Sequence, residues 1–161
     1  MLGIKATFDH VAHAAHSIRS LLPLYRDLLG GEFIAGGEND RVGFRSVQLQ
    51  FANGGRVELL EALEGSSFLE GFFKRAGSGG LHHVTFKVAD IDDALAAARR
   101  HGLEPFGVFT EHEHWQEFFI HPRSANGALV QLAHSTFELG DDNRPPMTLE
   151  AFLDNPSNYW S

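Results

Sequence analysis

The chain has 161 residues, of which 43% are hydrophobic and 14 are Phe, and this is enough apolar material for one packed domain. Acidic residues outnumber basic residues by 21 to 13, for a formal net charge of −8, so nucleic acid is not an expected partner. The chain has no cysteine, which excludes a disulfide framework, a thiolate nucleophile and Cys-ligated zinc or iron–sulfur clusters. Any metal must therefore be held by His and oxygen ligands.

The first half of the chain predicts a strand, a helix and a hairpin. Residues 8–15 are a short apolar stretch typical of a strand. A helix follows that Ser17 or Ser20 caps and that ends at the Gly pair 30–31, with Pro23 in its first turn. Apolar residues alternate over 43–51, and the Asn-Gly-Gly turn at 53–55 leads into the apolar run 56–60. These features predict a β-hairpin.

The second half repeats this order after a helical linker. We expect the linker helix over residues 66–76, capped by Ser66 or Ser67 and ended by the glycine-rich segment 77–80. A strand over 81–88 precedes a helix that Asp90 caps and Gly102 ends. Strands over 118–121 and 128–132 follow. In the polar tail we expect a short helix near 149–153. For the closing Tyr159 and Trp160 we expect that they clasp a partner subunit or cover the cup, and the alternative is a frayed terminus.

An internal repeat explains why the two halves agree. Displacing the sequence by 73 residues aligns twelve identical pairs without a gap, where composition alone would give roughly three or four. Among these pairs are His10 with His83 and Val57 with Val130. We therefore predict a tandem duplication within a single domain. Its modules span residues 7–64 and 80–134, with a helical linker at 65–79 and a tail at 135–161.

The repeat also places four polar side chains at equivalent positions. Glu58 follows His10 by 48 residues, and Gln131 follows His83 by the same 48. If a pseudo-twofold axis relates the modules, all four side chains converge on one point. Two imidazoles, a carboxylate and a carboxamide oxygen form a suitable ligand set for a divalent first-row metal such as manganese, cobalt, nickel, zinc or iron. An octahedral ion held in this way keeps two positions open for a bidentate substrate.

Structural explanations compete with the metal hypothesis. His10 and His83 could be strand histidines that merely inherited the same place in the duplication, Glu58 a half-exposed strand residue and Gln131 a neutral filler. His82 alternates to the strand face opposite His83, so we expect it to be structural. We also expect His13 to pack under the first helix.

Five segments are informative beyond the repeat: Phe8–Ala12, Arg56–Glu61, Phe68–Val88, Asp90–Asp92 and His121–Ser124. They resemble the vicinal oxygen chelate superfamily, which is the glyoxalase, bleomycin-resistance and dioxygenase group. Within this superfamily they are most similar to methylmalonyl-CoA epimerases. The resemblance covers about residues 7 to 134 and implies an α+β fold, in which paired βαβββ modules form a curved mixed-sheet cup. It also implies metal ligands at the positions of His10, Glu58, His83 and Gln131, and a homodimer.

The chain departs from the epimerase pattern at two places. The second-module ligand of that pattern is a Glu that also transfers protons, whereas Gln131 cannot take up a proton, and the carboxylate stands instead at the pseudo-symmetric Glu58. The glycine-rich segment before the His-Pro motif is replaced by residues 111–116, which contain His112 and His114.

We expect metal-assisted removal of a proton α to a carbonyl of a small chelating substrate, as in an isomerase or lyase. Glu58 is the predicted base, and His112, His114 or Glu117 would have to supply a second acid or base. One alternative is an iron-dependent dioxygenase, with His10, His83 and Glu58 as a facial triad and Gln131 as a bystander. The other is a non-catalytic protein that binds a small molecule.

The sequence also predicts where the protein acts. The first ten residues lack the apolar core of a signal peptide, and no apolar run approaches the roughly 20 residues that span a bilayer. We therefore expect a cytoplasmic protein with no membrane partner.

Overall fold

The fold is that of a computed structural model, which describes residues 3–136 and 146–156. These residues form two compact units. One unit, here called the β5–β8 unit, contains residues 3–10 and 83–136. The other, here called the β2–β4 unit, contains residues 11–82 and 146–156. Strand β1 (Ala6–Ala15) contributes its first half to one unit and its second half to the other.

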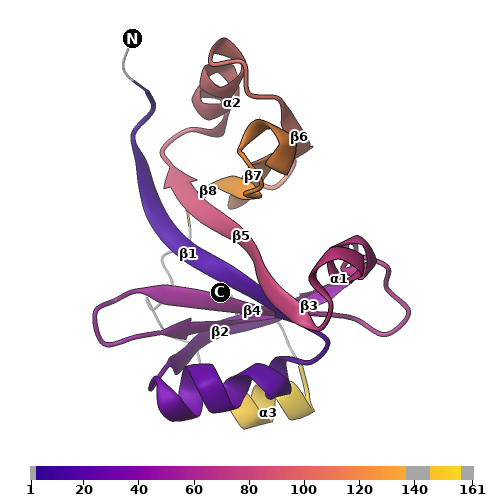
Figure 1. Cartoon of the computed structure of the whole chain (residues 1–161). Coiled ribbons are helices and arrows are strands. Elements are labelled where there is room, and N and C mark those ends of the chain that lie inside the picture. Colours follow the sequence, from indigo (N-terminus) through magenta and orange to yellow (C-terminus); the bar gives the residue numbers. More distant parts are fainter. Residues whose placement is uncertain (1–2, 137–145, 157–161) are drawn as a thin grey trace. The chain divides into compact units, whose positions relative to one another are not determined.

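The β2–β4 unit is a mixed sheet with η1, η2 and α3 on one face and α1 on the other. Its strands follow the order β2-β3-β4-β1, in which β1 runs parallel to β4 and the other pairs are antiparallel. The short helix α3 lies beside η1 and η2 below the strands (Figure 1). The bounds are β2 Glu32–Asn39, β3 Phe44–Gln50, β4 Arg56–Ala62, η1 Ile18–Leu21, η2 Pro23–Leu28, α1 Glu70–Ala76 and α3 Leu149–Asp154.

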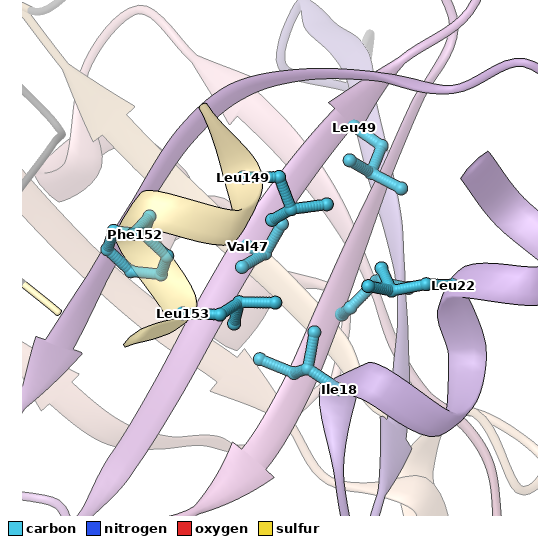
Figure 2. Packing of buried hydrophobic residues seen from close by; sticks show 8 residues of the cluster. Ile18, Leu22, Val47, Leu49, Leu149, Phe152 and Leu153 are labelled. Carbon is cyan, nitrogen blue, oxygen red and sulfur yellow. The ribbon is translucent and has the colours of Figure 1, made fainter. Parts of the chain in front are cut away.

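Apolar side chains from three distant segments form the main core of this unit. Val47 and Leu49 alternate along β3, so both point to the same face of the sheet. Figure 2 shows Phe152 of α3 and Ile18 of η1 packed around them. Helix α3 is therefore part of the core of the β2–β4 unit, because its apolar residues Leu149, Phe152 and Leu153 are buried in this cluster.

The β5–β8 unit repeats the arrangement of the β2–β4 unit, with β5, β6, β7 and β8 in the places of β1, β2, β3 and β4. Its strands follow the order β5-β8-β7-β6, and β5 runs parallel to β8. Helix α2 packs against β6, β7 and β8, and the side chain of Asp90 accepts a hydrogen bond from the Asp93 N–H, which confirms the predicted cap. The bounds are β5 Gly79–Val88, α2 Ile91–Arg100, β6 Pro105–Phe109, β7 Trp115–Ile120, η3 Pro122–Ser124 and β8 Val130–Ser135.

The strand registers confirm the duplication. Ala12 pairs with Glu58 across β1 and β4, and Thr85 pairs with Gln131 across β5 and β8. Adding the 73-residue displacement to the first pair gives the second. The element order strand, helix, three strands occurs twice, so the predicted α+β fold of βαβββ modules is confirmed.

Two helix boundaries differ from the predictions. The first helix is divided into a 3₁₀ turn and a π-helix that begins at Pro23, because proline has no N–H to continue the preceding helix. Ser17 precedes this segment but forms no side-chain cap; instead Ser20 Oγ donates a hydrogen bond to the Ser17 carbonyl. Helix α1 begins at Glu70 rather than after Ser66 or Ser67, because Ser66 Oγ accepts from the Phe68 N–H in a separate turn.

The predicted tail helix is confirmed as α3, capped by Thr148, whereas Tyr159 and Trp160 lie outside the described residues. Within residues 3–136 and 146–156, no helix has the length and apolar character needed to cross a membrane.

His13 packs against η2, as expected from the sequence. Its Nδ1 atom lies 2.8 Å from the Tyr25 hydroxyl, and the two rings meet edge to face. Burial lowers the pKa of His13 below its ordinary value of 6.5, and burial also lowers the pKa of His82.

The lowered pKa values predict acid sensitivity. As the pH falls through 6.5, the unfolded chain binds more protons than the folded chain, so the free energy of unfolding should decrease between pH 7 and pH 5. We expect the His13→Gln variant to show a shallower decrease in urea unfolding over this range, with part of the slope left because of His82. The matched substitution His101→Gln, at an exposed histidine, is the reference with which the slope of His13→Gln is compared. An unchanged slope in His13→Gln would contradict this account.

Candidate metal centre

A buried histidine, His10, and a half-buried histidine, His83, face each other in the β5–β8 unit. His10 on β1 and His83 on β5 have ring centroids 5.7 Å apart, with the planes inclined by 69°. One ring nitrogen of His10 lies within 4.8 Å of one ring nitrogen of His83. The structure therefore brings together the two imidazoles that the repeat predicted, at a spacing that a single cation can bridge.

Asp9 orients the His10 ring. Asp9 Oδ2 lies 2.6 Å from His10 Nδ1, and both side chains are buried. A carboxylate on one ring nitrogen fixes the ring orientation and directs the other nitrogen, Nε2, toward the opposite side. This arrangement is common around metal-bound histidines. Sequence reasoning did not select Asp9, because neighbouring residues on a strand point to opposite faces.

Thr85 and Gln131 continue the polar cluster beyond His10. Thr85 Oγ1 lies 3.0 Å from His10 Nε2 and donates a hydrogen bond of 2.5 Å to Gln131 Oε1. A hydroxyl has one hydrogen, so Thr85 presents a lone pair to His10. Gln131 thus lies one hydroxyl group away from His10. Thr85 was missed because threonine is not a typical metal ligand, but its position two residues after His83 places it on the same strand face.

Glu117 joins the cluster through Gln131. Its Oε2 atom accepts hydrogen bonds from Gln131 Nε2 at 2.6 Å and from Trp115 Nε1 at 2.8 Å. The Lys87 ammonium lies 3.9 Å from the centre of the Trp115 ring system. Of the predicted acid–base candidates, Glu117 is therefore placed beside a predicted ligand.

His112 and His114 lie in the surface loop between β6 and β7. The His114 N–H donates to His112 Nδ1, and His114 Nδ1 lies 2.8 Å from Thr136 Oγ1. His112 is exposed, and the side chain of His114 is 45% exposed. These contacts hold the two histidines in the loop, in contrast to the buried positions of His10 and Gln131.

Glu58 lies in the β2–β4 unit, in a buried row of polar residues. It occupies β4 directly opposite Ala12 of β1 and Gln48 of β3, so Gln48 and Glu58 point to the same face. Ser46 precedes Gln48 by two residues and shares this face. All three side chains are buried. Among the residues that the structure describes, Ser46 Oγ and Gln48 Oε1 form no hydrogen bond.

The donor set of the β5–β8 unit suits a divalent cation. His10 and His83 offer ring nitrogens, and Gln131 offers an amide oxygen. Asp9 supplies the carboxylate that typically supports a metal-bound imidazole. The residues present therefore fit a first-row divalent metal with nitrogen and oxygen ligands.

In the described part of the chain, Ser46 Oγ and Gln48 Oε1 on β3 are buried without a hydrogen bond. We therefore expect that replacing one of these polar groups by an apolar one stabilises the fold. A buried polar atom without a hydrogen bond costs free energy, so we expect Gln48→Met to raise the free energy of unfolding by about 1 kcal/mol in urea titrations. Gln50 lies at the exposed end of the same strand, and Gln50→Met should change the value by less than about 0.5 kcal/mol. A destabilised Gln48→Met variant would show that this carboxamide is satisfied in solution.

Comparison with known proteins agrees with the fold. Residues 9–133 match the family model described as the Glyoxalase/Bleomycin resistance protein/Dioxygenase superfamily. The chain is 31% identical over 127 residues to the mitochondrial methylmalonyl-CoA epimerase of Dictyostelium discoideum, which covers 77% of this chain and 75% of the relative. It is 30% identical over 127 residues to the ethylmalonyl-CoA/methylmalonyl-CoA epimerase of Cereibacter sphaeroides, which covers 77% of this chain and 94% of the relative.

Solved structures show the same fold. The methylmalonyl-CoA epimerase of Mycobacterium tuberculosis superposes with a TM-score of 0.72 at 24% identity, covering 85% of this chain and 94% of that chain. A Streptomyces coelicolor methylmalonyl-CoA epimerase in complex with 2-nitronate-propionyl-CoA gives a TM-score of 0.69 at 25% identity, covering 85% and 100%. With its family match over 125 residues (133 − 9 + 1), the chain belongs to the Glyoxalase/Bleomycin resistance protein/Dioxygenase superfamily.

Proposed function

We propose that this chain is a divalent-metal-dependent epimerase, which removes the proton on the carbon next to the thioester carbonyl of a CoA ester similar to methylmalonyl-CoA. The observation that carries the proposal is the pair of buried His10 and half-buried His83, with Asp9 orienting His10. The named relatives support the reaction class, because they are epimerases of methylmalonyl-CoA or ethylmalonyl-CoA.

The proposed ligands are His10, Glu58, His83 and Gln131. His10, His83 and Gln131 belong to the same unit, and Gln131 is linked to His10 through Thr85. Glu58 is included because it stands in the repeat at the position equivalent to Gln131, 73 residues earlier.

The base is proposed from which side chain can accept a proton. A bound divalent cation supplies Lewis acidity, which stabilises negative charge on a carbonyl oxygen. Glu58 is the proposed base, because it is a carboxylate and Gln131 at the equivalent position cannot accept a proton. Epimerisation also needs a proton returned to the opposite face of the reacting carbon. His112, His114 and Glu117 are the predicted candidates for this second role.

The named relatives favour an epimerase over the alternatives, and the surroundings of Gln131 are compatible with its proposed role as a ligand. A dioxygenase with a triad of His10, His83 and Glu58 would leave Gln131 as a bystander. Instead, both ends of the Gln131 amide are engaged, and its oxygen points to the hydroxyl that contacts His10. A non-catalytic binding protein would not require a carboxylate-oriented histidine pair. Neither alternative is favoured by the named relatives.

The assembly and the location of the protein stay predictions. The homodimer follows from the family resemblance, and the cytoplasmic location follows from the sequence. Size-exclusion chromatography with light scattering would determine the oligomeric state.

Solvent isotope exchange tests the proposed reaction. Metal-loaded protein is incubated with methylmalonyl-CoA in D₂O, and loss of the α-proton signal is followed by NMR. We expect exchange well above the uncatalysed rate, and a decrease of about 10²- to 10⁴-fold in Glu58→Gln because the variant lacks the base. Glu64 is exposed after β4, and Glu64→Gln is the matched control that should retain the wild-type rate.

Two results would contradict the proposal. The first is wild-type exchange that Glu58→Gln leaves unchanged. The second is oxygen consumption by the iron-loaded protein with no deuterium incorporated, which would favour the dioxygenase.

A further inference from the structure

We infer that Glu117 is a positioning residue that fixes the side-chain amide of Gln131, so that Gln131 presents its oxygen and not its nitrogen toward Thr85 and His10. This inference rests on the proposed function, because it concerns how Gln131 could serve as a ligand. The oxygen is the atom of a neutral amide that binds a cation, so the orientation of the amide decides whether Gln131 can contribute.

The hydrogen bonds at the two ends of the amide define its orientation. Gln131 Nε2 donates to Glu117 Oε2 at 2.6 Å, and Gln131 Oε1 accepts from Thr85 Oγ1 at 2.5 Å. An ionised carboxylate only accepts hydrogen bonds, so it favours the NH₂ end of the amide. A flipped amide would place Oε1 against the carboxylate oxygen. Charge-assisted bonds are about twice as strong as neutral ones, so Glu117 has the larger influence on the amide.

The strands place Glu117 where this contact forms. On β7 and β8, Glu117 pairs with Ala133 and Phe119 pairs with Gln131. Glu117 and Gln131 are therefore diagonal neighbours on one face of the sheet, within reach of long side chains. The register alone brings the carboxylate and the amide together.

Trp115 holds the carboxylate in this position. Its Nε1–H donates to the same Oε2 atom at 2.8 Å, and Trp115 lies two residues before Glu117 on the same strand face. Lys87 lies over the Trp115 rings at 3.9 Å. A carboxylate oxygen that already accepts from an indole N–H has less freedom to turn away from Gln131.

The arrangement removes an ambiguity that an amide at position 131 has and a carboxylate would not have. A carboxylate presents oxygen in either rotamer, whereas an amide presents oxygen in only one of two orientations. Glu117 restores a single orientation from the neighbouring strand. The role assigned to Glu117 is thus different from that of an acid or base, since the carboxylate acts through Gln131.

Exchanging the carboxylate for an amide tests the inference. In Glu117→Gln the new side chain can donate as well as accept, so both orientations of Gln131 become possible. In the metal-free protein, we expect the side-chain NH₂ resonances of Gln131 to lose the downfield shift of a charge-assisted hydrogen bond. In titration calorimetry with Mn²⁺ or Co²⁺, we expect the affinity to fall about 10- to 100-fold.

Two further variants serve as controls. Glu104 is exposed before β6, and Glu104→Gln should change neither the resonances nor the affinity. The double variant Glu117→Gln with Gln131→Glu exchanges the two groups. We expect its affinity for Mn²⁺ to return at least to the wild-type value, because a carboxylate at 131 needs no orienting group. This variant also provides a test if Glu117→Gln fails to fold.

The outcomes separate this inference from the proposed function. Unchanged Gln131 resonances in Glu117→Gln would overturn the positioning role, and so would unchanged metal affinity with a loss of turnover only, since that pattern belongs to an acid or base. If the wild type binds no metal, the proposed function fails. The resonances of the metal-free protein would still show whether Glu117 orients the amide.

Discussion

The contact between Asp9 Oδ2 and His10 Nδ1, 2.6 Å long and buried, is the constraint on which the polar cluster depends. With one nitrogen of His10 engaged, the other must face the interior of the cluster. Removing a carboxylate from water costs several kcal/mol unless strong hydrogen bonds compensate for it, so a protein keeps such a pair buried only where other interactions support it. The neighbouring strand supplies this support, through Thr85 and the half-buried ring of His83.

From His10 the hydrogen bonds continue across three strands. Thr85 connects His10 to Gln131, and Glu117 connects Gln131 to Trp115. In the links from Thr85 to Gln131 and from Gln131 and Trp115 to Glu117, a donor faces an acceptor, which is the condition for a buried polar network to be stable. The polar face of β3 is different, because Ser46 Oγ and Gln48 Oε1 have no such partners in the described part of the chain. Polar groups buried at a cost are typical of sites that function requires.

Much of the fold and part of the site could be predicted from the sequence, because the duplication left a fixed 73-residue displacement. That displacement placed His10 and His83 at equivalent positions of the repeat, and likewise Glu58 and Gln131. The registers of β1 with β4 and of β5 with β8 differ by the same 73 residues. Asp9 and Thr85 could not be predicted in the same way, since their roles depend on side-chain rotamers and on a contact between neighbouring residues. The prediction of one continuous first helix was wrong in detail, because the helix is interrupted at Pro23 and apolar periodicity alone does not show this interruption.

Metal content tests the central claim most directly. Untagged wild-type protein would be measured by elemental analysis beside His10→Ala and Glu58→Ala, after incubation with manganese, cobalt, nickel, zinc or iron and removal of the excess. We predict near-stoichiometric metal in the wild type and its loss in both variants, because each removes one proposed ligand. No metal in the folded wild type, or full retention in His10→Ala, would contradict the account.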